Sequence, residues 1–139
     1  MSYTPFSKTY ENWAPVVGRI FIASVFLAGA WFKIPGTAGF SMEAGFTAAA
    51  GVPLAGIAVF LAFLLEVISG AALIIGWKTR PVAFILVLYI ILLTLIFHLH
   101  FGTPQDIGMF IEHLALIGGL LYISVLGAPF AAVTKDMPL

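Results

Sequence analysis

Four long apolar runs alternate with short polar links along the chain. A helix that spans a bilayer needs about 20 mostly apolar residues, and the runs that meet this requirement are residues 14–34, 53–77, 81–101 and 107–127. Pro53 and Pro81 fall in the first turn of their runs, where proline suits a helix start. Each run is therefore predicted to form a transmembrane helix.

The lengths of the links predict how these helices pack. Links 78–80 and 102–106 are so short that the helices on either side must be antiparallel neighbours, which is the arrangement of a four-helix bundle. The link 35–52 is longer, and its stretch 41–46 is compatible with a short interfacial helix capped by Ser41. The predicted fold is an all-α integral membrane bundle that forms one domain over residues 1–139.

Composition and charge place this bundle in a bilayer. Of the 139 residues, 62% are apolar and 9% are charged, whereas soluble domains have about 25% charged residues. Lys and Arg concentrate in short cytoplasmic loops. Here one side of the bundle carries Lys8, Lys78, Arg80 and Lys135, and the other side carries only Lys33. The side with more cations also holds both termini, so both termini are predicted to be cytoplasmic. The net charge is zero, which argues against a nucleic-acid partner. The absence of cysteine excludes disulfides, thiolate-bound Fe–S clusters and covalent c-type haem.

Ionisable side chains inside the runs are the candidate functional residues, because charges in a bilayer are costly. Glu66 falls near the middle of the second run. A carboxylate at that depth must be protonated or paired, and Arg19 is the predicted partner. This pair either fixes the register of two helices or forms part of a proton or ligand site.

The fourth run contains two adjacent polar residues, Glu112 and His113. Glu112 shares a helical face with small residues at 108, 115 and 119, so it is predicted to face the bundle. His113 is rotated by about 100° and is still expected on the inward half. The pair serves either a ligand or another helix.

Several polar groups are predicted to converge at similar depth on the outer side, which is the usual picture of a small-molecule site. The predicted quinone-binding set is Arg19, Lys33, Glu66, His98, Glu112 and His113. Cations and imidazoles would donate to the ring oxygens, and a carboxylate would exchange protons. Two alternatives stay open: a metal site formed by His98, His100, His113 and Glu112, and haem held by His98 and His113. No residue is assigned a catalytic role.

An ordered set of short motifs resembles the DoxX family of small bacterial membrane proteins over about residues 14–128. The matching segments are Gly18-Arg19, Lys33, Ala50-Gly51-Val52-Pro53, Leu65-Glu66-Val67-Ile68-Ser69-Gly70, Thr79-Arg80, Phe97-His98 and residues 114–121. Two positions depart from the pattern. Glu112-His113 stands where the family often has Lys-Asn, and Ala30 replaces a glycine.

The resemblance implies a four-helix protein of the inner membrane that is tied to quinone-linked redox chemistry. Examples in the family include a subunit of a thiosulfate:quinone oxidoreductase and oxidoreductase complexes with soluble redox partners. The expected chain is a quinone-binding subunit that acts with a partner protein rather than alone. The alternatives are a non-catalytic accessory or assembly subunit of a larger membrane complex, and a small transporter or metal-handling protein. Assembly as a homo-oligomer also stays open.

Overall fold

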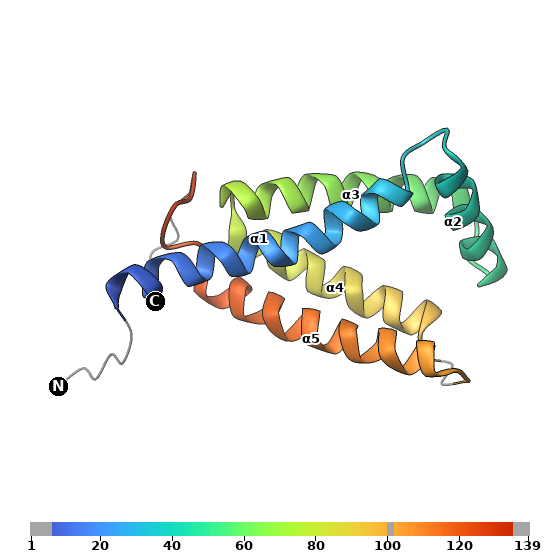
Figure 1. Ribbon diagram of the computed structural model, residues 1–139. Coiled ribbons are helices and arrows are strands. Elements are labelled where there is room, and N and C mark those ends of the chain that lie inside the picture. Colours follow the sequence, from blue (N-terminus) through green and yellow to red (C-terminus); the bar gives the residue numbers. More distant parts are fainter. Residues whose placement is uncertain (1–6, 100–101, 135–139) are drawn as a thin grey trace.

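The computed structural model describes residues 7–99 and 102–134, which form an all-helical bundle (Figure 1). The helices are α1 (Lys8–Phe32), α2 (Ala38–Ala49), α3 (Ala55–Ile75), α4 (Thr79–Phe97) and α5 (Pro104–Leu126). All of them except α2 are long and apolar enough to cross a membrane. The predicted all-α membrane bundle is confirmed, and so is the short helix in the first link.

Local signals in the sequence explain where helices begin and end. Thr103 caps α5: its hydroxyl accepts from the Asp106 amide, and the Asp106 carboxylate accepts from the Thr103 amide. With Pro104 in the first turn, this reciprocal cap starts α5 three residues before the predicted start at 107. Thr37, not Ser41 as predicted, caps α2 by accepting from the Phe40 amide.

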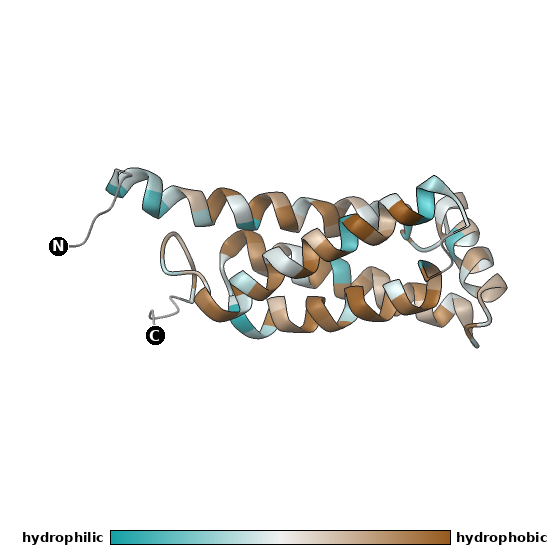
Figure 2. Ribbon diagram, turned by 90° about the horizontal axis from the view of Figure 1, so that it is seen from below, coloured by the Kyte–Doolittle hydropathy of each residue, from teal (hydrophilic) through white to brown (hydrophobic). Residues whose placement is uncertain are grey.

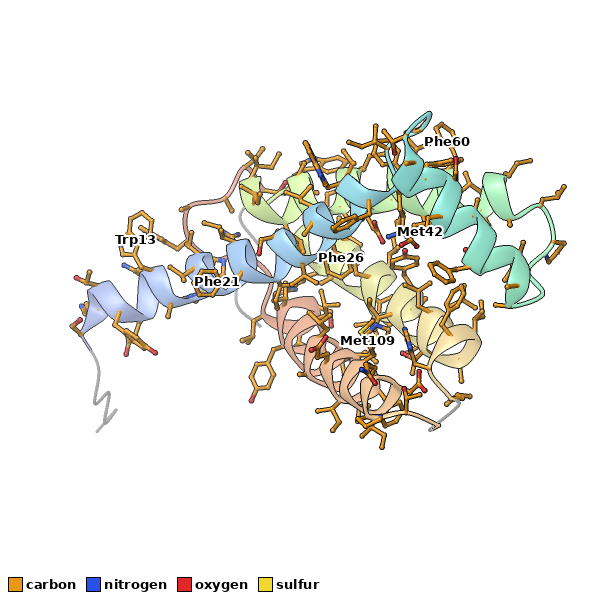
Figure 3. All side chains as sticks on the ribbon, turned by 45° about the vertical axis from the view of Figure 1, so that its right-hand side comes forward. Trp13, Phe21, Phe26, Met42, Phe60 and Met109 are labelled. Atoms are coloured by element: carbon orange, nitrogen blue, oxygen red, sulfur yellow. The ribbon has the colours of Figure 1, made fainter. Side chains whose placement is uncertain are left out.

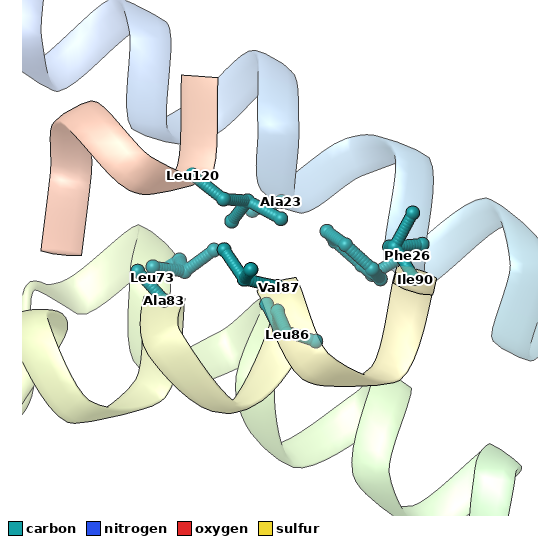
Figure 4. Packing of buried hydrophobic residues seen from close by; sticks show 8 residues of the cluster. All are labelled: Ala23, Phe26, Leu73, Ala83, Leu86, Val87, Ile90 and Leu120. Atoms are coloured by element: carbon teal, nitrogen blue, oxygen red, sulfur yellow. The ribbon is translucent and has the colours of Figure 1, made fainter. Parts of the chain in front are cut away.

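The long helices pack as two antiparallel pairs, α1 with α3 and α4 with α5. The pairs meet at a core cluster to which α1, α3, α4 and α5 all contribute (Figure 4). Its buried members are Ala23, Phe26, Leu73, Ala83, Leu86, Val87, Ile90 and Leu120. The short helix α2 lies mainly against α3.

We call the end of the bundle where α1 begins and α5 ends the terminal end (Figure 1). There the C-terminal segment (residues 127–134) pairs with the end of α3, because the amides of Val133 and Thr134 donate to the carbonyls of Ile75 and Gly76. Trp13 of α1 contacts the ring of Phe130 edge to face, with centroids 5.2 Å apart. The opposite end, which we call the α2 end, holds α2, the end of α4 and the start of α5 (Figure 1).

Apolar side chains cover the outside of the helices as well as the core (Figure 2). On α1, Phe26 is buried while Phe21 is 69% exposed, and both are labelled in Figure 3. Such exposed aromatic and aliphatic surface is suited to lipid rather than water.

Candidate functional site

A cavity of about 750 Å³ lies at the α2 end of the bundle. Its wall is formed by residues of α2, α3, α4 and α5 and by Lys33, the C-cap of α1, so it lies between the two helix pairs and beside α2. Most of its lining is apolar, with polar groups at a few positions. The lining residues are Lys33, Glu43, Phe46, Thr47, Val52, Ala58, Val59, Ala62, Tyr89, Leu92, Leu93, Ile96, Phe97, His98, Asp106, Met109 and His113.

A buried ion pair and a tyrosine form the first polar group of the wall. The ammonium of Lys33 lies 3.2 Å from Oε2 of Glu66, and the two side chains are 15% and 5% exposed. The Tyr89 hydroxyl donates to Oε1 of the same carboxylate at 2.6 Å. Lys33 also donates to the carbonyl of Gly29 at 3.2 Å. Each carboxylate oxygen thus has a donor, as burial of a charge requires.

Gly29 allows the carboxylate of Glu66 to pack close to α1. A Cβ built on Gly29 would lie only 3.2 Å from Oε2 of Glu66. At the end of α1, Gly29 leaves space for the Glu66 carboxylate of α3, and Lys33 supplies its counter-charge. Glu66 does not line the cavity itself. Its two hydrogen-bond donors, Lys33 and Tyr89, do.

The predicted pair of Arg19 with Glu66 is wrong. Arg19 is 1% exposed at the terminal end, where it donates to the carbonyls of Phe130 and Ala131 at 3.3 and 3.0 Å. The reason is the register of the antiparallel α1–α3 pair. Lys33 lies level with Glu66, whereas Arg19 lies level with Gly76, on which a Cβ would stand 2.7 Å from the guanidinium.

Two histidines and a threonine form the second polar group. Nδ1 of the buried His113 lies 2.7 Å from the Thr94 hydroxyl. The rings of His98 and His113 meet edge to face with centroids 4.9 Å apart. Nδ1 of His98 is buried and has no hydrogen-bond partner in the described part of the chain. The α4–α5 pair therefore places both imidazoles at the cavity wall.

The predicted inward orientation of Glu112 is also wrong. Glu112 is exposed, as are Gly108 and Ala115 on its face. The face of α5 that packs on the bundle contains His113 and Leu120 instead. Bulky apolar residues also lie on the exposed side of this helix, Ile111 and Leu114 among them, so apolar character alone does not mark the face that packs inward.

The structure thus brings together part of the predicted site. Lys33, His98 and His113 line the cavity, and Glu66 contacts it through Lys33. Arg19 and Glu112 lie elsewhere, and His100 falls outside the described residues. Four residues at or behind the cavity wall were not among the predicted site residues: Tyr89, Thr94, Glu43 and Asp106. Tyr89 and Thr94 were detectable as hydroxyl-bearing residues in the third apolar run, where a buried hydroxyl needs a partner.

Two alternative ligand sets involve these histidines, and the metal set stays a prediction because its His100 lies outside the described residues. Within residues 7–99 and 102–134, no three His, Cys, Asp or Glu side chains lie close enough to hold one metal ion. The edge-to-face contact of His98 with His113, at 4.9 Å between centroids, leaves no space for an iron porphyrin between the rings.

Comparisons with known proteins agree on a family. The family model described as DoxX matches residues 14–99, which covers α1 to α4 and stops before α5. The chain is 32% identical over 120 residues to the inner membrane protein YqjF of Escherichia coli strain K12. That alignment covers 86% of this chain and 88% of the relative. No solved structure matches.

Proposed function

Since this chain belongs to the DoxX family and is a multi-pass inner membrane protein, we propose that its cavity binds a quinone or a similar amphipathic ring. In this proposal the chain supports quinone-linked redox chemistry together with a partner protein. The observation behind it is the cavity at the α2 end, into which both helix pairs direct polar groups. Its volume of about 750 Å³ falls within the range of small-molecule sites, roughly 300–1,000 Å³.

The lining suits a ring with polar oxygens and an apolar tail. Apolar contact for a ring comes from two helices that line the cavity: Leu92, Leu93, Ile96 and Phe97 of α4, and Val59 and Ala62 of α3. The ammonium of Lys33 has three N–H groups, of which two donate to the Gly29 carbonyl and the Glu66 carboxylate. The third N–H is left for a ligand oxygen. The apolar outer surface lets a lipid-soluble ligand reach the protein from the bilayer.

The redox step needs a second protein. The chain has no cysteine, so it cannot hold an Fe–S cluster through thiolates. In the proposed reaction a partner protein exchanges electrons with the bound ring, while this chain binds and orients the ring.

A cavity-filling substitution tests the binding proposal. Ala62→Phe on α3 places a ring in the cavity and leaves the ion pair of Lys33 with Glu66 intact. Ala71→Phe, the same change at an exposed position of the same helix, is the matched control. Calorimetric titration of the detergent-purified chain with decylubiquinone should show binding to the wild type and to Ala71→Phe. Ala62→Phe should weaken it at least about tenfold, since one lost contact worth about 1.4 kcal/mol suffices.

The proposal fails if the wild-type chain does not bind the probe, or if Ala62→Phe binds it as tightly as the wild type. Thermal unfolding of both variants checks that each is folded. Lipid partitioning of the probe affects both variants equally, so the difference between them reports the cavity.

A second candidate, a non-catalytic accessory subunit, is favoured by the exposed face of α5. Gly108, Glu112 and Ala115 lie on that face, and a carboxylate among apolar side chains is costly in lipid. A transmembrane helix of a partner would cover it, since small residues allow close approach. A photo-crosslinking residue at 115 should then capture a partner protein in membranes, whereas one at the exposed Ile68 of α3 should not. Equal labelling at both sites would contradict this candidate.

A further inference from the structure

The Thr94 hydroxyl fixes which nitrogen of His113 holds a proton. Thr94 Oγ1 lies 2.7 Å from the carbonyl oxygen of Ile90 and 2.7 Å from Nδ1 of His113. A hydroxyl has one hydrogen, and a carbonyl can only accept. The hydrogen of Thr94 must therefore point to Ile90, since otherwise two oxygen lone pairs would face each other at 2.7 Å. A lone pair of Thr94 then faces Nδ1, which must donate.

This arrangement leaves Nε2 of neutral His113 as an acceptor. An uncharged imidazole has one N–H, so a proton on Nδ1 means that Nε2 has none. The described residues make no hydrogen bond to Nε2. His113 lines the cavity, so a ligand there meets an imidazole that accepts a hydrogen bond rather than donates one.

Most other polar groups of the wall have the same bias toward acceptors, while the Thr47 hydroxyl can donate or accept. The Tyr89 hydroxyl donates its hydrogen to Glu66, so toward a ligand its oxygen can only accept. Glu43 and Asp106 line the cavity with carboxyl groups. Lys33 has a single N–H left after its bonds to Gly29 and Glu66, and His98 contributes one further N–H. A quinone has two oxygens that only accept, whereas its reduced quinol also has two hydroxyl hydrogens to donate.

We infer that the cavity selects a hydroxylated ring, a quinol or phenol, over the corresponding quinone. One ring hydroxyl donates to Nε2 of His113, and a ring oxygen accepts from Lys33. His113 determines this specificity, and Thr94 is a positioning residue that holds the imidazole in the required tautomer. The inference rests on the proposed function, because it assumes that the cavity binds a ring ligand.

The tautomer is testable without any ligand. Long-range ¹H–¹⁵N NMR spectra of the ¹⁵N-histidine-labelled chain at alkaline pH distinguish the two neutral tautomers, and His98→Ala and His100→Ala variants assign the signals. His113 should show a protonated Nδ1. Thr94→Val, which keeps the shape and removes the hydroxyl, should lose this pattern, and Thr94→Ser should retain it. A protonated Nε2 in the wild type would overturn the inference.

The selectivity is tested with three rings of nearly equal apolar surface. These are decylubiquinol under anaerobic conditions, decylubiquinone, and the dimethyl ether of the quinol, which lacks both donors. The wild type and Thr94→Ser should bind the quinol about tenfold more tightly than the other two, the worth of one well-placed hydrogen bond. In Thr94→Val this preference should fall below about threefold.

The outcomes distinguish a failure of the quinol selectivity from a failure of the proposed ring-binding function. Binding of the quinone or the ether as tightly as the quinol by wild-type chain overturns the selectivity and leaves the proposed site standing. If none of the three rings binds, the proposed function fails first. The wild-type spectra and titrations decide the matter even if Thr94→Val does not fold.

Discussion

Removing one charge of the Lys33–Glu66 pair should destabilise the protein, and removing both should cost less than the sum. Glu66→Gln keeps the shape of the side chain and leaves the ammonium of Lys33 without a counter-charge. Lys33→Met removes the ammonium and leaves the carboxylate with Tyr89 alone. Each single change leaves one buried charge without its partner. The double variant removes both charges, so its loss of stability is smaller than the sum of the two single losses.

The distance and the burial set the magnitude. Two unit charges at 3.2 Å attract by roughly 5 kcal/mol at an effective dielectric constant of about 20. Loss of one partner of a fully buried pair costs about 3–5 kcal/mol. Lys33 stays 15% exposed at the end of α1 and can turn toward water, so we expect about 2–4 kcal/mol for each single variant. The expected coupling energy is about 1–3 kcal/mol.

A double-mutant cycle measures this coupling. The free energy of unfolding of wild type, both single variants and the double variant is obtained by SDS titration in mixed micelles, followed by far-UV circular dichroism. A control cycle combines Glu66→Gln with Lys78→Met, at the exposed lysine that precedes α4 at the terminal end. Since Lys78 and Glu66 share no contact, their effects should add within about 0.5 kcal/mol.

The reasoning is refuted if Lys33→Met and Glu66→Gln are additive within the same margin as the control cycle. That result would mean that the two charges are solvated separately and that their proximity adds nothing to stability. A double variant less stable than the sum of its parts would also contradict it.

Three further predictions concern other parts of the bundle. Arg19→Met should speed amide hydrogen exchange in the C-terminal segment (residues 127–134) about tenfold, as expected when hydrogen bonds to two carbonyls are lost; unchanged exchange would refute the anchoring role. Gly76→Ala should lower the free energy of unfolding, measured by chemical unfolding, by about 2–4 kcal/mol, because Gly76 has φ +70° and a Cβ there would lie 2.5 Å from Ala132. The control Gly45→Ala, in open space within α2, should leave the free energy of unfolding unchanged or raise it. Glu112→Gln should change the free energy of unfolding by less than about 0.5 kcal/mol, and a larger loss would mean that Glu112 packs inside the bundle.

The number and order of the helices were predictable from the sequence. In a bilayer each spanning segment must satisfy its own backbone hydrogen bonds, so the length of an apolar run reports a helix directly. The ends of the helices were less predictable. Thr37 and Ser41 are both suitable caps, and the chain uses Thr37, which follows a glycine with φ +83° that turns the chain away from α1.

The depth of a residue was predictable, but the rotation of its helix was not. Depth follows from position along a run, and it correctly grouped Lys33, His98 and His113 at one end. Rotation is normally read from an apolar stripe, but lipid and core are both apolar, so the stripe is absent. The small residues near Glu112 were therefore read as an interior face, although Gly108 and Ala115 are exposed and only Gly119 packs against α1.

The choice of Lys33 rather than Arg19 as the partner of Glu66 required the axial register of α1 against α3. Both cations lie on one face of α1, so the sequence pattern alone does not separate them. The long link that contains α2 sets how far α1 and α3 slide past each other, and link length fixes that only loosely.

The division into two helix pairs has a consequence for how a ligand would be found. At the α2 end the hydrogen bond from Tyr89 to Glu66 ties one pair to the other, and any molecule in the cavity contacts both. Its binding free energy therefore adds to the cohesion between the pairs. A ligand at about 100 times its dissociation constant raises the free energy of unfolding by about 2.7 kcal/mol. The melting temperature of the purified chain is thus a label-free report of occupancy, and a library of membrane-soluble compounds can be screened with it before any reaction is known.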